Sequence, residues 1–322
     1  MNCFNVDLPE RLKQKLQKGC LNKAGSIADF SDLKLKKLGF SMDEMNIVRS
    51  EAAKSFQIEN GKVLEMFHHK DYRWSRISLG CIALDAATNG GISTRGVTEI
   101  FGESGVGKTQ LLLQLCLMVQ LPQNIGGLKK HAVYICTEDI FPSRRLYQLI
   151  DKFQQQFDSS ISYAENVFVE HIIEMDELMD CVFSKLPKLL KIKNIGLIII
   201  DSIAGVFRLQ DDIVKRANTM RKLVAELRRL ANKYNCAVVC SNQVTSGLTH
   251  LNESQPSLGL AWAHLITTRL KISKIYRKSE LYHTNLNPVC SSLIRTMETI
   301  FSPGSSRGYA KFLISSDGIE EA

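Results

Sequence analysis

Residues 102–109, GESGVGKT, combine residue types and spacing that suit phosphate chemistry. They fit the pattern G-x-x-x-x-G-K-[ST], after the strand-like run GVTEIF and before an apolar helical pattern. Glycines let backbone N–H groups approach a phosphate closely, and the helix N-terminus adds partial positive charge. Lys108 adds a full charge, and the Thr109 hydroxyl suits magnesium. The predicted nucleotide-binding residues are Gly102, Glu103, Ser104, Gly105, Val106, Gly107, Lys108 and Thr109.

A carboxylate ends a second apolar run, LIIID at residues 197–201. In open α/β sheets, ligands bind at the carboxyl ends of the strands. Asp201 would therefore lie beside the metal shell, opposite Thr109. A buried strand ending in Asp is by itself weak evidence for a metal site. Together with the glycine-rich turn, it predicts one.

Polar side chains also follow two further strand-like runs. VYICTED ends in Glu138 and Asp139, and a carboxylate there can orient a water toward the γ-phosphate. Asp139 suits the alternative role of a helix-entry acid before Pro142. VVCSNQV carries Asn242 and Gln243, amides that can sense the γ-phosphate. As a bare dipeptide they would instead indicate a turn.

Composition restricts the class of protein. The 322 residues, 44% of them hydrophobic, suffice for one large α/β domain with a small appendage, and a net charge of +8 suits a polyanionic partner. Nine cysteines at irregular spacings include no CxxC pair, which predicts a reducing compartment without a disulfide framework or a zinc site. The longest uncharged stretch, residues 109–128, contains proline and glycines, so no membrane partner is expected.

Three regions follow one another along the chain. Residues 1–60 have the periodicity of a small helical domain, and residues 61–77 read as a linker. Residues 78–322 begin with alternating strand-like and helical patterns, typical of a mostly parallel sheet with helices on both faces. After Leu260 strand follows strand, which predicts an antiparallel extension of the same sheet with a turn at Asp317 and Gly318.

Five segments resemble the RecA-type recombinases of eukaryotes and archaea in order and spacing. They are GVTEIFGESGVGKTQ, AVYICTEDIFPSRRL, LIIIDSIAGVFR, CAVVCSNQVT and LGLAWAHLITTRLKI. GGLKKHAVYICTEDIFPSRRLYQL and RISLGCIALD are most similar to one recombinase paralogue of that family. The resemblance covers nearly the whole chain. It implies a RecA-like P-loop ATPase core, a small N-terminal all-helical domain, and ATP with Mg²⁺ as cofactors.

The resemblance also implies roles for matching residues. It assigns phosphate binding to Lys108, magnesium to Thr109 and Asp201, water positioning to Glu138, and sensing between the nucleotide and a DNA loop to Gln243. Glu138, Lys108 and Gln243 would form the catalytic set. In family filaments a histidine reaches the nucleotide of a neighbouring subunit, and His264 in AWAHLITTRL matches it. Without the resemblance, His264 would read as a packed histidine.

Family members bind single-stranded DNA through two loops, which correspond here to residues 207–216 and 245–258. The candidate phosphate contacts are Arg208, Lys215, Arg216 and Arg221. The alternative is a solvated basic helix face, balanced by Asp211, Asp212 and Glu226. The second loop has no Arg, Lys, Phe, Tyr or Trp, and is therefore a poor platform for stacking bases.

Two departures from the family argue against self-sufficient filaments. Recombinases that polymerise carry Phe-x-x-Ala in the linker, and no such tetrad occurs between residues 54 and 77. The segment KKLGFSMDE keeps one glycine, Gly39, of the hairpin that contacts duplex DNA in the family. Val63 or Leu64 would remain as a degenerate plug for a specialised partner.

The function expected from the resemblance is that of an ATP-gated subunit in homologous-recombination DNA repair. The chain would pair with the recombinase paralogue lettered C and would assemble, cap or remodel the main recombinase filament on single-stranded or branched DNA. The expected location is the nucleus, with the cytoplasm also open, and any ATP hydrolysis would be slow. The alternatives are a self-sufficient strand-exchange recombinase and a non-enzymatic scaffold stabilised by its nucleotide.

Overall fold

The computed structural model describes residues 8–18, 31–54, 74–208, 212–245, 255–275 and 294–322. The chain divides into two units, Met1–Arg73 and Trp74–Ala322. Residues 61–73 of the expected linker lie outside the described residues. Its last two residues, Arg76–Ile77, form β1, which pairs with β2 (Ile92–Ser93) of the second unit because the Ile77 side chain is buried there.

The first unit contains α1 (Glu10–Lys18), α3 (Asp32–Lys37) and α4 (Met42–Lys54) in its described part. Its core contains Leu8, just before α1, and Leu12 and Leu16, whose four-residue spacing places them on one face of α1. At the start of α4, the Ser41 hydroxyl accepts the Glu44 amide at 3.2 Å, and the Glu44 carboxylate accepts the Ser41 amide at 2.9 Å. This reciprocal capping begins the helix there.

The second unit contains a nine-stranded sheet within its described residues. In spatial order its strands are β13 (Ile319–Glu321), β12 (Tyr309–Ile314), β11 (Arg295–Phe301), β10 (Thr268–Lys274), β3 (Thr98–Phe101), β7 (Ala237–Asn242), β6 (Ile195–Asp201), β4 (His131–Cys136) and β5 (Val167–His171). Neighbouring strands from β10 to β5 are parallel, and those from β10 to β13 are antiparallel. The predicted C-terminal extension is confirmed.

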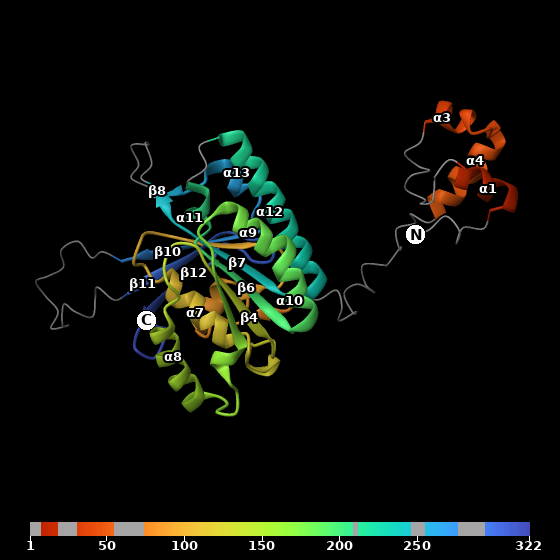
Figure 1. Ribbon diagram of the computed structural model, residues 1–322. Helices are drawn as coiled ribbons and strands as arrows, with labels where there is room; N and C mark the ends of the chain where they lie inside the picture. Colours follow the sequence, from red (N-terminus) through yellow and green to blue (C-terminus); the bar gives the residue numbers. More distant parts are fainter. Residues whose placement is uncertain (1–7, 19–30, 55–73, 209–211, 246–254, 276–293) are drawn as a thin grey trace, which may run out of the picture. The chain divides into compact units, whose positions relative to one another are not determined.

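Helices cover both faces of this sheet, as predicted (Figure 1). One core includes side chains of α6 (Ile82–Ala87), α7 (Lys108–Met118) and α8 (Ser143–Gln156). The other includes side chains of α9 (Met175–Asp180), α10 (Leu186–Ile192), α11 (Ile203–Arg208), α12 (Ile213–Tyr234) and α13 (Gly259–Ala263). Along β6, Ile199 packs into the first core and Ile198 into the second, so the uninterrupted apolar run is explained by burial on both sides.

Short elements complete the described chain. They are the 3₁₀ helices η3 (Gln123–Ile125) and η4 (Tyr163–Asn166), the π-helical turn η5 (Cys181–Lys185) between α9 and α10, and the paired strands β8 (Val244–Thr245) and β9 (Gln255–Pro256). Gly318, with φ 125°, turns β12 into β13 at the predicted position. None of the helices in the described ranges has the length and apolarity needed to cross a bilayer.

Sheet register brings the polar strand ends together. In the parallel ladders Phe101 pairs with Asn242, and Cys136 pairs with Asp201. The carboxyl ends of β3, β7, β6 and β4 therefore lie side by side, and the residues that follow these strands share one edge of the sheet.

Candidate functional site

The turn between β3 and α7 is shaped by its glycines. Gly107 is the N-cap of α7, with φ 106°, a backbone conformation that favours glycine. A Cβ there would lie 2.2 Å from Cδ1 of Ile314, and a Cβ on Gly102 would lie 2.2 Å from the carbonyl oxygen of Ile272. The turn therefore requires glycine at 107 for its backbone conformation and at 102 for its close packing against the backbone of Ile272, and it leaves the first N–H groups of α7 available to an anion.

Lys108, the first residue of α7, folds back over this turn. Its Nζ donates to the carbonyl oxygens of Gly102 at 2.7 Å and Glu103 at 2.8 Å. Burial lowers the pKa of the Lys108 ammonium, and the negative charges of Asp201 and Glu138 oppose that shift. The cation is held at the mouth of the turn by backbone oxygens, which a phosphate can replace as its partner.

Thr109 and Asp201 face each other, as the sequence predicts. The Thr109 hydroxyl donates to Oδ2 of Asp201 at 2.9 Å. The same carboxylate accepts the Tyr134 hydroxyl at 2.5 Å and the Ser241 hydroxyl. Burial, with a contribution from Asp201, raises the pKa of Tyr134 well above its usual value, so that Tyr134 acts as a donor. This hydroxyl and carboxylate are oxygen ligands of the kind that Mg²⁺ prefers, so the donor set fits the predicted metal.

Glu138 and Gln243 also meet at this edge of the sheet. Nε2 of Gln243 lies 2.9 and 2.7 Å from the two carboxylate oxygens of Glu138. Arg208 joins them: its Nη2 donates to Oε1 of Gln243, and its Nη1 lies 3.5 Å from Oε1 of Glu138. The carboxylate thus faces an amide and a cation from two other elements.

A pocket of about 420 Å³ lies between these groups. Its lining residues are Ser104, Gly105, Gly107, Lys108, Thr109, Gln110, Glu138, Asp139, Asp201, Ser202, Gln243, Arg295 and Ile314. The predicted nucleotide residues Gly102, Glu103 and Val106 do not line it. Val106 is fully buried and packs in the core, whereas the carbonyl oxygens of Gly102 and Glu103 accept from Lys108. The volume and polarity suit a phosphate-bearing ligand.

Two lining residues, Arg295 and Ile314, come from the antiparallel extension and were missed by sequence reasoning. Nε of Arg295 donates to the carbonyl oxygen of Val106 at 3.0 Å, and burial lowers the pKa of its guanidinium. Arg295 therefore adds a second positive charge beside Lys108. No motif marks it, because β11 reaches the turn only through the order of strands in the sheet.

Arg145 was likewise missed. It anchors α8 to the pocket wall and the C-terminal hairpin, with Nε donating to Gln110 Oε1 and the guanidinium reaching the carbonyl oxygens of Ser315 and Ser316, each at 2.7 Å.

Asp139 lines the pocket and caps no helix; the N-cap of α8 is Pro142, and no side chain bonds there. The alternative reading of Asp139 as a helix-entry acid gains no support from this geometry.

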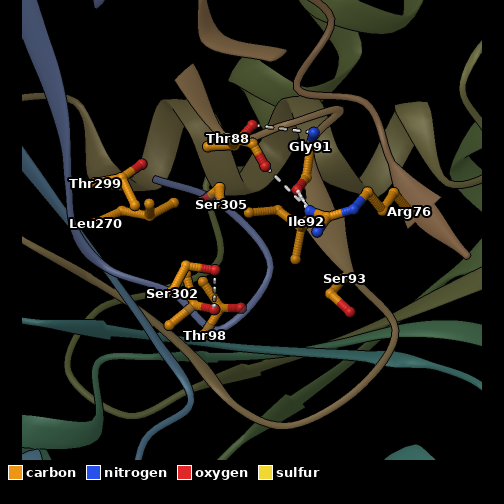
Figure 2. Close-up of a pocket in the computed structure, with 11 residues that line it drawn as sticks. Arg76, Thr88, Gly91, Ile92, Ser93, Thr98, Leu270, Thr299, Ser302 and Ser305 are labelled. Atoms are coloured by element: carbon orange, nitrogen blue, oxygen red, sulfur yellow. Dashed lines mark hydrogen bonds between the residues drawn. The ribbon is translucent and has the colours of Figure 1, made fainter. Parts of the chain in front are cut away.

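A second pocket, drawn in Figure 2, lies elsewhere in the unit. It has a volume of about 10 Å³, about the room that one water needs. Arg76 lines it and donates to the carbonyl oxygens of Thr88 at 3.0 Å and Gly91 at 2.9 Å. Its size excludes a nucleotide, and the glycine turn is the candidate site because Lys108, Thr109 and Asp201 meet there.

His264 is exposed and does not line the nucleotide pocket. It is the C-cap of α13, which is anchored by buried Trp262. The alternative of a packed histidine is therefore wrong. An exposed position is what contact with a neighbouring subunit requires, and that role remains a prediction.

The four candidate DNA contacts separate into two groups. Arg208 lies at the nucleotide pocket with Glu138 and Gln243, whereas Lys215, Arg216 and Arg221 lie on α12, with Lys215 and Arg221 exposed. Residues 209–211 and 246–254 of the two expected DNA loops lie outside the described residues.

Asp212, which the alternative reading uses to balance the basic helix face, caps α12. Its Oδ1 accepts the amides of Val214 at 2.9 Å and Lys215 at 3.0 Å. Glu226 pairs with Arg229 at 2.6 Å, farther along the helix. These two acids are thus engaged by the helix itself.

Comparison with known proteins agrees with this geometry. The model of the Rad51 family matches residues 72–320. DNA repair protein XRCC3 of Mus musculus is 34% identical over 99% of this chain and 97% of its own length, and XRCC3 of Bos taurus is 39% identical over 76% of this chain and 74% of its own. DNA repair protein rhp57 of Schizosaccharomyces pombe is 31% identical over 76% of this chain and 78% of its own length. The chain therefore belongs to the Rad51 family of RecA-type recombinases, as a paralogue similar to XRCC3.

Proposed function

We propose that the chain binds ATP with Mg²⁺ and acts in recombinational DNA repair. The observation that carries the proposal is the hydrogen bond of 2.9 Å from the Thr109 hydroxyl to the Asp201 carboxylate. It lies next to the glycine turn, where the Lys108 ammonium donates to a backbone carbonyl oxygen. When bound, Mg²⁺ would neutralise part of the negative charge of the phosphates. Thr109 and Asp201 would hold it, and Lys108, Arg295 and the turn's N–H groups would bind the phosphates. The family is a nucleotide-binding one, and the names of the relatives support the role in repair.

Hydrolysis by this chain is slow in our proposal. A carboxylate that positions the attacking water must keep a lone pair directed at that water. Here both oxygens of Glu138 accept from Gln243, and Arg208 adds a cation beside them. Turnover requires these contacts to be exchanged for contacts with water and nucleotide, so the resting arrangement favours binding over turnover.

The chain acts as an ATP-gated subunit of a heteromeric complex in this proposal. The partner is the recombinase paralogue lettered C, and the complex assembles, caps or remodels the main recombinase filament on DNA in the nucleus. The similarity to recombinase paralogues supports a recombinase partner and DNA. The exposed His264 supports a nucleotide placed near a subunit boundary.

The test is the mass of the assembly by light scattering, with ATP and magnesium present or absent. The full chain is measured alone and mixed with the paralogue lettered C. We expect a discrete complex that needs ATP and that is lost in Lys108→Ala. Lys188→Ala, an exposed lysine on α10, is the matched control and should assemble as the native chain does. If Lys108→Ala assembled as the native chain does, ATP would not control assembly. If the complex formed with a nucleotide that is never hydrolysed, the alternative of a non-enzymatic scaffold stabilised by its nucleotide would be favoured.

A further inference from the structure

One buried carboxylate, Glu99, joins three strands and a helix beneath the nucleotide pocket. Glu99 lies on β3 and is 0% exposed. Its Oε1 accepts Nδ2 of Asn242 on β7 at 2.6 Å and Nε1 of Trp262 on α13 at 2.7 Å, and its Oε2 accepts Nε of Arg269 on β10 at 2.5 Å. A buried charge is tolerated only when it is paired and hydrogen-bonded, so each of these donors has a defined place around Glu99.

Asn242 transmits this arrangement to Gln243. The Asn242 side chain is fully buried, and its Oδ1 accepts the backbone amide of Gln243 at 2.8 Å. The Gln243 side chain then reaches Glu138 in the pocket. If the Asn242 amide turned away from Glu99, the backbone from which Gln243 extends would lose its anchor.

The Asn242 side chain also holds Ser257, which follows β9 in the chain. Asn242 Nδ2 also donates to the carbonyl oxygen of Ser257 at 2.9 Å, the Ser257 hydroxyl donates to Asn242 Oδ1, and the Ser257 amide donates to the carbonyl oxygen of Gln243 at 2.8 Å. Val244 of β8 pairs with Pro256 of β9 just beyond. Gln243 and Ser257 are therefore tied to Asn242 and to each other.

Arg269 makes the network depend on the charge of Glu99. Its guanidinium contacts the rings of Phe101 and Phe301, with centroids 5.7 and 5.4 Å away, and the Arg269 side chain is 11% exposed. Among the described residues, Nη2 of Arg269 has no hydrogen-bond partner. The Glu99 carboxylate is thus the group that neutralises this enclosed cation within the described chain.

We propose that Glu99 is a positioning residue for the nucleotide pocket, which acts through Asn242 to fix Gln243 against Glu138 and to hold Ser257 beside Gln243. This inference rests on the proposed function for its consequence, the preference for ATP over ADP, but its structural part stands without it. Hydrogen bonds impose direction, which apolar contacts between the same strands would not do. Glu99 itself touches no ligand.

The experiment compares Glu99→Gln and Trp262→Phe with the native full-length chain. Glu99→Gln replaces the charge while keeping one acceptor oxygen, and Trp262→Phe removes one donor while keeping an aromatic ring in the core. Hydrogen exchange is measured at the amides of Gln243 and Ser257. We expect exchange to accelerate by about tenfold or more in Glu99→Gln, and by less in Trp262→Phe, because local opening becomes easier.

Calorimetric titration with ATP and with ADP measures the functional part. We expect the preference of Glu99→Gln for ATP over ADP to fall by about fivefold or more, with ADP affinity kept within about twofold, because the phosphate-binding turn is intact. A merely structural role would lower stability without changing this ratio. Thr299→Val is the matched control, since Thr299 is 1% exposed and donates to the carbonyl oxygen of Ala87 at 2.9 Å, outside the network.

The outcomes separate the two proposals. Unchanged exchange at Gln243 and Ser257 in both variants would overturn the positioning role. An unchanged ATP preference in a Glu99→Gln chain that binds both nucleotides would overturn its link to the pocket. Accelerated exchange in a chain whose native form binds no ATP would support the positioning role and reject the proposed function. A fall in preference that Thr299→Val also produces would attribute the effect to stability.

Discussion

At the scale of single residues, the distance between two charges matters less than their burial. The Glu99–Arg269 contact is 2.5 Å and the Glu226–Arg229 contact is 2.6 Å, yet the side-chain exposures are 0% and 11% against 12% and 51%. Removing one partner of a buried pair leaves an uncompensated charge and costs about 3–5 kcal/mol. Water replaces the lost partner of an exposed arginine, so the second pair contributes far less. Loss of Glu99 alone would therefore destabilise the fold by leaving Arg269 unpaired, as well as releasing Asn242.

Asp201 offers the sharpest test of the metal site. In Asp201→Asn the carboxylate that faces Thr109 is lost, and an amide nitrogen meets the Tyr134 or Ser241 hydroxyl in its place. We expect the enhancement of ATP affinity by Mg²⁺ to fall by about tenfold or more, since one charge-bearing oxygen ligand is gone. Titration of ATP with and without Mg²⁺ measures the enhancement.

Tyr134→Phe is the control for that substitution. It removes one donor to Asp201 and keeps both carboxylate oxygens, so the Mg²⁺ enhancement should persist. If Asp201→Asn retained the full enhancement, the metal would have to be held by other residues.

At the scale of elements, α12 determines what its basic residues can do. Asp212 caps the helix and Glu226 engages Arg229, which leaves Lys215 and Arg221 on an exposed surface near the helix start. Arg208, on α11, faces the nucleotide pocket instead. We therefore expect phosphate contacts with DNA from the basic residues near the start of α12, and a role at the nucleotide pocket for Arg208.

Substituting glutamine for Lys215, Arg216 and Arg221 together should flatten the salt dependence of single-stranded DNA binding. Each lost phosphate contact reduces the slope of log affinity against log salt by about 0.7 on single strands, so the expected change is about 2. Fluorescence anisotropy at several salt concentrations measures it.

Arg229→Gln on the same helix is the matched control, and it should leave the slope unchanged because its guanidinium pairs with Glu226. An equal loss of slope in the control would mean that net charge acts without defined contacts.

At the scale of the whole molecule, two features bear on whether the chain assembles with itself or with a partner. The core has the pocket and the exposed His264, while the region between residues 54 and 77 lacks the Phe-x-x-Ala tetrad with which polymerising family members join subunits. The candidate plug residues Val63 and Leu64 lie outside the described residues. The absent tetrad is the feature of the sequence that argues against open-ended growth.

We expect the chain alone, with ATP, Mg²⁺ and single-stranded DNA, to remain a species of fixed mass. Light scattering over a range of protein concentrations measures this, since a filament grows with concentration and a closed species does not. Restoring the tetrad by substituting residues 63 and 66 with Phe and Ala provides the comparison chain. Concentration-dependent growth of the native chain would support the self-sufficient recombinase.

Much of the candidate site could be predicted from local signals. The glycine spacing marks the turn, and helix α7 begins at Lys108 as expected. The apolar runs before these polar residues are buried parallel strands: Asp201 ends β6, Glu138 follows β4, and Gln243 follows β7. Parallel direction alone places these ends on one edge of the sheet, whereas the strand order, with β6 between β7 and β4, brings them side by side.

What tertiary structure alone decided depends on contacts between residues far apart in sequence. Arg295 reaches the turn because β10 pairs with β3 and β11 with β10, an order that the sequence does not encode locally. Glu99 appears in sequence as a lone acid in an apolar strand, and its partners Asn242, Trp262 and Arg269 lie more than a hundred residues away. Side-chain direction, as for Arg208, is likewise decided by the surrounding fold, since a flexible arginine turns toward the nearest acceptors. The sequence by itself determined the phosphate-binding turn and the sheet edge that serves it, whereas packing determined which distant charges complete and orient that site.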